Sequence, residues 1–251
     1  MATISNVYTQ YVGESDGRGE SGLLWKKCPW ADIQDSLSRG YAFQDDFLAF
    51  NPTGTVYTST SATTGTTALD DAAGGVLLLD CGSGTEHQGE TLQMGTTVGE
   101  CWVTSTTNDL WFETRVKVVD SATDCQLFAG LSEIDTTLLA SGANTSANHI
   151  GFESLTDDGV LTFHAEVAGA RTSATATIGT LVEDTWVRLG FHVSKRNKIQ
   201  VYVDGVLKDT LTAGFPLVEM TPSFVMQSGG GATDPILHID WFRVAATLSA
   251  S

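Results

Sequence analysis

The sequence has few basic residues: 13 Lys and Arg stand against 30 Asp and Glu, and the formal net charge at pH 7 is −17. So acidic a surface repels polyanions, which excludes direct binding to nucleic acid and to an anionic membrane as functions. The sequence also lacks any run of about 20 apolar residues, the length that crosses a bilayer as a helix. Its first residues contain neither the basic nor the apolar segment of a signal peptide, so we expect synthesis in a cytoplasm.

Residues spaced for metal or cofactor chemistry are missing as well. The five histidines never stand at HxH or HExxH spacing, and the four cysteines form no CxxC pair. No GxSxG segment marks a serine nucleophile, and the glycines at 229–231 do not stand between a strand and a helix, as a phosphate-binding loop requires. We therefore expect no metal and no cofactor. Two states stay open for the four cysteines, which are Cys28, Cys81, Cys101 and Cys125. They are either reduced and buried, or paired as disulfides after release into an oxidising medium.

Helical signals are sparse, whereas strand signals recur at short spacing. Proline occurs only 5 times and glycine 26 times, and threonine, which favours half-exposed strands, is abundant. Residues 110–119 and 186–193 alternate apolar and polar side chains, as strands with one buried face do. Residues 199–203 alternate again and run into Asp204-Gly205, a pair that favours the two-residue turn of a hairpin. Many such segments without a βαβ unit predict an all-β fold, a two-sheet antiparallel jelly-roll sandwich.

The first 40 residues differ in character from the rest of the sequence. A glycine-rich polar stretch at 13–22 is followed by leucines and tryptophans crowded into residues 23–30. This combination is typical of an extended arm whose apolar anchors lie on another surface. A second interpretation stays open, in which the two tryptophans fill the protein's own core. We predict an extended N-terminal arm over residues 1–40, a sandwich domain over residues 41–251, and these partner-contact residues in the arm: Tyr8, Tyr11, Leu23, Leu24, Trp25 and Trp30.

Three motifs in the last third of the sequence carry a resemblance. A tryptophan opens the segment at 186–191, the next strand ends in Tyr202-Val-Asp-Gly205, and the last reads Ile239-Asp-Trp-Phe-Arg-Val244. This order resembles the concanavalin A-like lectin and glucanase jelly roll, which laminin-G-type domains share, over residues 41–247. The resemblance implies the fold but leaves sugar binding, hydrolysis and scaffolding open, because one fold hosts all three.

A second resemblance lies near the front of the sequence. A Cys28-Pro-Trp30 segment precedes Gly40-Tyr-Ala-Phe-Gln-Asp-Asp-Phe47, and a threonine-rich stretch then ends in Ala73-Gly-Gly-Val76. These segments are similar to structural proteins of tailed bacteriophages, some of which decorate or cement capsids. The resemblance implies a virion component.

The glycanases of the jelly-roll family carry Glu-x-Asp-x-Glu or Glu-x-Asp-x-x-Glu on one strand. The two glutamates divide the nucleophilic and proton-transfer work between them. In this sequence Glu133 and Asp135 fit the first two positions, but Thr137 and Leu138 stand where the second glutamate belongs. A lone carboxylate has no partner for either role, so we expect no enzyme activity and interpret both acids as solvated loop residues.

Sugar binding without cleavage is the alternative function. It requires exposed aromatic rings that stack on a sugar, together with oxygen acceptors for its hydroxyls. Trp111 and Tyr202 are the candidate sugar-contact residues. Asp204 and Trp241 are also considered, although the hairpin already explains Asp204 and a tryptophan within a strand usually packs.

The hypothesis that combines these observations is a non-enzymatic viral structural protein, a decoration or cement subunit on the outer surface of a bacteriophage head. The inner wall of a capsid faces packaged polyanion, so a subunit of charge −17 belongs outside. Its partners would be the major capsid protein and copies of the chain itself, as a homotrimer by analogy with other jelly rolls. In the alternative, the chain is a carbohydrate-binding module of a phage tail or receptor-binding appendage, and its partners are surface glycans.

Overall fold

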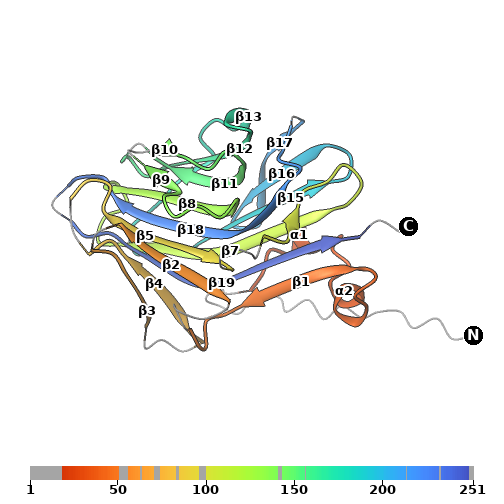
Figure 1. Ribbon diagram of the computed structural model, residues 1–251, viewed down its shortest axis with the longest axis horizontal. Coiled ribbons are helices and arrows are strands. Elements are labelled where there is room, and N and C mark those ends of the chain that lie inside the picture. The colour runs from red at the N-terminus through yellow and green to blue at the C-terminus, as the bar shows by residue number, and fades with distance from the viewer. Residues whose placement is uncertain are drawn as a thin grey trace, which may run out of the picture.

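The structure of the protein is a computed structural model, which describes residues 19–50, 56–62, 64–70, 74–82, 85–95, 100–140, 143–155, 157–212, 214–231 and 233–248. Most of its regular structure is strand, in two large antiparallel sheets that pack into a sandwich (Figure 1). The predicted all-β jelly-roll sandwich is therefore confirmed. No helix within the described ranges is long and apolar enough to cross a membrane.

The first sheet, called sheet A here, has eight strands, and β19 (Ile236–Thr247) lies inside it with paired strands on both of its edges. Two strands share one edge of β19: β4 (Val76–Asp80) pairs with residues 236–239 and β1 (Gly40–Asp45) pairs with residues 242–247. The strands beyond them, on either side, complete the sheet. In spatial order these are β17 (Val206–Leu211), β16 (Lys198–Val203), β15 (Val187–Ser194) and β7 (Leu110–Val119) on one side, and β3 (Thr66–Asp70) next to β4 on the other.

The second sheet, sheet B, has nine strands, and β8 (Cys125–Ser132) pairs along its length with β18 (Glu219–Ser228). The remaining strands follow on either side. They are β11 (His149–Ser154), β12 (Val160–Val167) and β13 (Ala170–Ala174) next to β8; β5 (Gly89–Met94) and β2 (Tyr57–Ala62) next to β18; and the short β14 (Gly179–Thr180) and β6 (Trp102–Val103). A separate small hairpin joins β9 (Leu139–Ala140) to β10 (Ala143–Asn144).

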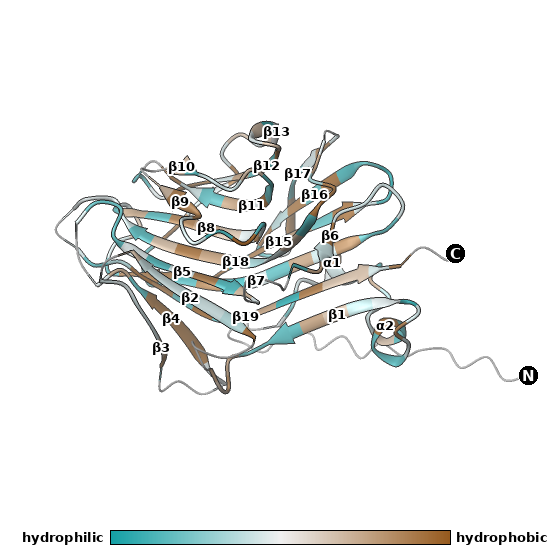
Figure 2. Ribbon diagram, in the orientation of Figure 1, coloured by the Kyte–Doolittle hydropathy of each residue, from teal (hydrophilic) through white to brown (hydrophobic). Residues whose placement is uncertain are grey.

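The core lies between the two sheets, because alternate side chains of the strands point inward. Figure 2 shows brown and teal segments alternating along these strands. Phe112 of β7 and Phe242 of β19 face Phe224 of β18, with ring centroids 6.3 and 5.5 Å apart. Each such buried ring stabilises the fold by about 2–3 kcal/mol.

The hairpin predicted at Asp204-Gly205 is confirmed. These two residues connect β16 to β17, and both have positive φ, 50° and 74°. Positive φ at both central positions is the backbone of the tight hairpin turn that asparagine or aspartate followed by glycine favours. The turn sets the register in which Val203 lies opposite Val206.

The extended arm expected over residues 1–40 is corrected for its described part. Residues 22–35 form two short helices, α1 (Gly22–Trp25) and α2 (Trp30–Asp35), and α2 lies beside β1 (Figure 1). We call residues 19–35 the strap. Its leucine and tryptophan side chains bury apolar area on the outer face of sheet A, which an isolated extended chain would leave in water. Tyr8 and Tyr11 lie outside the described residues.

Candidate functional site

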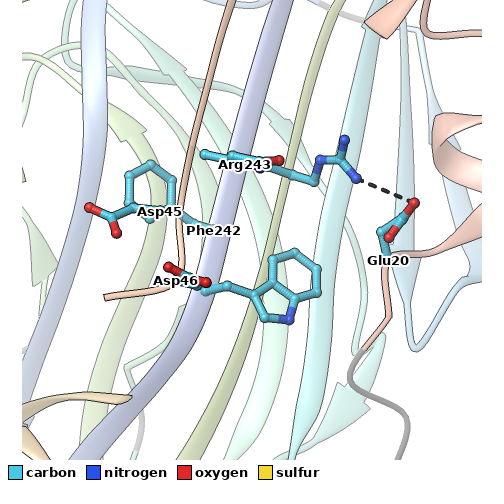
Figure 3. Close-up of a pocket in the computed structure, with 7 residues that line it drawn as sticks. Glu20, Asp45, Asp46, Phe242 and Arg243 are labelled. Carbon is cyan, nitrogen blue, oxygen red and sulfur yellow. Dashed lines mark ion pairs between the residues drawn. The ribbon is translucent and has the colours of Figure 1, made fainter. Parts of the chain in front are cut away.

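A polar recess of about 340 Å³ opens on the outer face of sheet A, where β1 ends beside β19. In Figure 3, Asp45 and Asp46 lie on one side of the recess, and the ion pair of Glu20 with Arg243 lies on the other. Three segments far apart in the sequence supply its walls. They are the end of β1 with Gln44, Asp45 and Asp46, the middle of β19 with Trp241, Phe242 and Arg243, and the strap with Glu20.

Hydrogen bonds hold the acidic wall in place. One oxygen of Asp45 accepts the backbone N–H of Phe47 at 2.8 Å, and the other accepts the hydroxyl of Tyr57 at 2.6 Å. Burial raises the pKa of Tyr57, and the hydrogen bond to Asp45 raises it further, so this hydroxyl keeps its proton and donates it. Asp45 therefore has both oxygens engaged, whereas the Asp46 side chain is exposed at the rim.

A β-bulge in β19 brings Trp241 to the recess. The pairing with β7 shifts between Ile239 and Trp241, and Asp240 forms a buried ion pair with Arg115 at 2.5 Å. Such a bulge inserts one residue and turns the following side chains relative to the regular alternation. The sequence contains a signal of it, because the inward side chains fall at 237 and 239 but then at 242 and 244.

Arg243 forms the basic wall and is fixed by the strap. Its guanidinium carbon lies 4.3 Å from the ring centroid of Trp25 and 4.0 Å from that of Trp30, and one of its nitrogens lies 3.5 Å from Glu20. Burial lowers the pKa of Arg243, and the charges of Glu20 and Glu113 oppose that shift. Arg243 is the one cation among the described residues that line the recess, and its orientation depends on the two indoles of the strap.

The strap is anchored on a buried carboxylate of β7. Trp25 donates its indole N–H to Glu113 at 2.6 Å, and the backbone N–H of Ser21 donates to the same carboxylate at 3.1–3.2 Å. Burial raises the pKa of Glu113, and the hydrogen bonds from Ser21 and Trp25 oppose the rise. Apolar side chains of the strap complete the contact and form, with residues of sheet A, a cluster separate from the main core: Leu24, Trp25, Cys28 and Ile33 against Trp111, Tyr202 and Ala245.

The described arm residues that were predicted to contact a partner differ in how far they are buried. Leu24 and Trp25 retain only 2% and 8% exposure against their own sheet, so the prediction that they contact a partner is wrong for this structure. The open interpretation placed the two tryptophans in the protein's own core, and Trp25 is indeed buried in its own chain, but in the separate cluster on the outer face of sheet A. Trp30 is half-buried beside Arg243. Leu23 is 56% exposed.

The predicted sugar contacts Trp111 and Tyr202 are also corrected. They keep 2% and 5% exposure, because the strap covers the face of sheet A from which they project. The ring of Trp111 stacks on His192 with centroids 4.7 Å apart, so a sugar has no access to that face of the ring. Of the aromatic residues considered from the sequence, Trp241 is the one that lines the recess.

Glu133 and Asp135 lie in the loop after β8, where they make local hydrogen bonds. Glu133 accepts the amide of Asn148 at 3.0 Å, and Asp135 accepts the backbone N–H of Thr137 at 2.8 Å. The outer face of sheet B beside them is covered, since the same loop packs two leucines onto it. This apolar cluster consists of Leu138 and Leu139 with Phe128 and Val225, and half-buried Leu155.

A second hollow, of about 330 Å³, lies between the β15–β16 turn and the loop before β18. Its one charged lining side chain is Arg196, and its apolar lining comes from Phe215 and Leu217. It lacks the combination of acceptors and an indole that the recess on sheet A presents.

All four cysteines are free thiols: Cys101 is exposed and Cys28, Cys81 and Cys125 are buried. Burial raises the pKa of Cys28 and of Cys125 to about 12, so neither is a reactive thiolate at neutral pH. Within the described part of the chain, no group of three or more His, Cys, Asp or Glu side chains could hold a metal ion.

No model of a known protein family matches the chain, and no curated protein sequence matches it. Solved structures do match. A protein of unknown function from Shewanella oneidensis MR-1 is 15% identical with a TM-score of 0.60, over 89% of this chain and 95% of that one. A β-glucanase from Bacillus licheniformis is 16% identical with a TM-score of 0.58, over 82% of this chain and 98% of that one. The carbohydrate recognition domain of Emp47p is 10% identical with a TM-score of 0.57, over 83% of this chain and 97% of that one. At such identities the similarity shows the fold alone, a concanavalin A-like jelly roll.

Proposed function

We propose that this concanavalin A-like sandwich is a non-enzymatic carbohydrate-binding module, and that the recess on sheet A holds a neutral saccharide. The observation that carries the proposal is the composition of the recess, in which the Trp241 indole lies among carboxylates, an amide and a guanidinium. Lectins and glucanases with this fold support a saccharide as the class of ligand, although their identity to this chain is low.

The lining groups match the chemistry of a sugar. Carboxylates such as Asp46 accept hydrogen bonds from hydroxyls, the guanidinium of Arg243 donates to hydroxyl oxygens, and Gln44 does both. The Trp241 indole offers an apolar surface for the C–H groups of a sugar ring. A volume of about 340 Å³ lies at the lower end for ligand sites, which suits a small saccharide or one end of a longer chain.

The charge of the recess favours a neutral ligand over an acidic one. Three carboxylates stand against one guanidinium, and Arg243 is already paired with Glu20. The chain as a whole carries −17. A uronic or sialic acid would bring its own negative charge into this field, which costs binding free energy at moderate salt.

Binding without cleavage is supported by how the acids are engaged. A glycosidase needs two carboxyl groups that are free to attack and to transfer a proton across the scissile bond. Both oxygens of Asp45 accept hydrogen bonds from the protein itself, and Glu20 pairs with Arg243. The sequence motif at Glu133 lacks its second glutamate.

The proposal is tested by calorimetry with a neutral mixed-linkage β-glucan tetrasaccharide and a broader array of neutral glycans, with glucuronate-containing oligosaccharides for comparison. Trp241→Ala is expected to weaken binding of a neutral glycan at least about tenfold, equal to about 1.4 kcal/mol. Trp186→Ala is the matched control, because Trp186 is a half-buried tryptophan that packs on Arg115 and does not line the recess. Equal affinity in Trp241→Ala and wild type, or hydrolysis of the bound glycan, contradicts the proposal.

A decoration or cement subunit on the outer surface of a phage head is a second proposal. The net charge of −17 supports an outer position, and exposed leucines near the front of the chain, Leu23, Leu37 and Leu48, offer apolar contacts for the capsid protein or for further copies in a homotrimer. Stoichiometric co-purification with intact particles is the result that this role requires. A chain that never accompanies particles would contradict it.

A further inference from the structure

We propose that the strap is a separately opening wall of the recess: it leaves sheet A as a unit while the sandwich stays folded, and saccharide binding and strap docking stabilise each other. The second half of this statement rests on the proposed carbohydrate function. The first half depends only on how the strap is attached.

The sandwich does not need the strap for its own core. The main cluster of buried apolar residues lies between the sheets and contains no residue of the strap, whose apolar side chains belong to the separate cluster on the outer face of sheet A. The strap adds no strand to either sheet, and the pairing of β1 with β19 begins only at Gly40. Opening the strap therefore leaves every strand pairing of the sandwich intact.

The strap is too short to be stable on its own. Its helices have four and six residues, and neither has a side-chain hydrogen bond at its N-terminal cap. Isolated helices need about 12–15 residues to be even marginally stable. The strap is thus ordered only by its contacts with sheet A, and loses its helices when these contacts break.

Docking leaves polar atoms unsatisfied, which reduces the cost of opening. Within the described part of the chain, two buried polar atoms of this interface, Trp111 Nε1 and Arg243 Nε, have no hydrogen-bond partner. A buried polar atom without a partner is less stable than a hydrated one. Water would satisfy both atoms after opening, and would also hydrate the carboxylate of Glu113.

Opening dismantles the recess because two of its determinants belong to the strap. Glu20 supplies one wall directly, and Trp25 and Trp30 hold the guanidinium of Arg243 between them. A ligand that contacts these groups binds the docked form in preference to the open form. By thermodynamic linkage, the ligand then shifts the strap towards docking by the same factor that docking adds to affinity.

The four cysteines provide a direct measurement of opening. Cys28 is 4% exposed beneath the strap, whereas Cys81 and Cys125 lie in the core between the sheets. Cys101 is exposed and is removed as Cys101→Ser. In this background under native conditions, we expect a thiol reagent to label Cys28 at least tenfold faster than the two core cysteines, because local opening is more populated than global unfolding. Labelling of all three at one rate overturns the proposal.

A pair of variants on α1 separates docking from folding. Leu24→Asp places a charge in the buried contact and should raise the Cys28 labelling rate a further tenfold or more while leaving Cys81 and Cys125 protected. Leu23→Asp changes the neighbouring leucine, which is exposed, and should leave the rate unchanged. Faster labelling of the core cysteines in Leu24→Asp would show that the strap and the sandwich unfold together, which overturns the proposal.

The coupling is tested with the neutral tetrasaccharide of the calorimetric experiment. At saturation it should slow Cys28 labelling at least fivefold in the parent, and Leu24→Asp should weaken its binding by a similar factor. Binding that leaves the Cys28 rate unchanged overturns the coupling. Failure of every neutral glycan to bind overturns the proposed function and the coupling together, while the labelling rates still decide whether the strap opens alone.

Discussion

Glu153 on β11 is a fully buried carboxylate on the outer face of sheet B, held by three cationic or titratable side chains. His149 Nε2 lies 3.2 Å, His164 Nδ1 2.5 Å and Arg171 Nη2 3.6 Å from its oxygens. Burial alone would raise the pKa of Glu153, but the hydrogen bonds from the histidines outweigh burial and lower it to about 2. Glu153→Gln keeps the shape and removes the charge. We expect a loss of about 3 kcal/mol in the free energy of unfolding at pH 7, measured by urea denaturation, because one of the two accepting oxygens becomes an NH₂ group and the buried donors around it lose an acceptor.

Glu133→Gln is the control for this substitution. Glu133 is the first residue after β8, is partly exposed and accepts a single side-chain hydrogen bond, from Asn148. Its replacement should change stability by less than about 0.5 kcal/mol. If the two variants lose equal stability, the buried contacts of Glu153 contribute no more to the free energy of unfolding than the single contact of Glu133 does.

At the scale of the element, the β16–β17 hairpin depends on a backbone conformation that only glycine adopts freely. Gly205 has φ of +74°, where a Cβ atom is strained whatever the space around it. Gly205→Ala should lower the free energy of unfolding by about 1–2 kcal/mol, seen as a lower urea midpoint at unchanged slope. Gly179→Ala is the matched control, because Gly179 has open space around its Cβ position and no positive φ. Equal midpoints for the two variants would contradict the strain argument.

The strands and the hairpin were predictable because period-two alternation reports which face of a strand is apolar. The same pattern does not report what covers the opposite face. In β7, Trp111 and Glu113 alternate with inward residues as expected of a half-exposed face, yet both are buried beneath the strap. The strap itself has no periodic apolar face, since its helices are only four and six residues long, so its docking could not be predicted from its own residues.

The recess was predictable only in part, for a related reason. Trp241 was considered as a sugar contact, but its position depends on a β-bulge in β19. The only sign of this bulge in the sequence is one interruption of the alternation between apolar and polar residues, which is too weak to place the bulge. Glu20 and Asp45 belong to segments with no shared motif and meet only because β1 pairs with β19 and the strap folds back over sheet A. Contacts of this kind are set by tertiary packing rather than by local pattern.

At the scale of the whole molecule, acid acts on stability through two buried glutamates with opposite signs. The folded pKa of Glu153, about 2, lies below its ordinary value of 4.5, so its contribution is complete above pH 4.5 and is lost as the pH falls towards 2. The pKa of Glu113 is raised by burial, so its contribution is present below pH 4.5 and is lost as the pH rises through the raised value. Protonation of the many surface acids also relieves the repulsion of a chain with charge −17.

The comparison of wild type with Glu153→Gln isolates one of these contributions, because Glu113 and the surface acids are common to both proteins. Urea denaturation between pH 4.5 and pH 2 should show wild type losing stability more steeply than the variant. The gap between the two curves should narrow by about 3 kcal/mol over this interval, as follows from a pKa lowered from 4.5 to about 2. Parallel curves would mean that Glu153 titrates in the folded protein as it does in the unfolded chain, and that its three neighbours do not hold its charge.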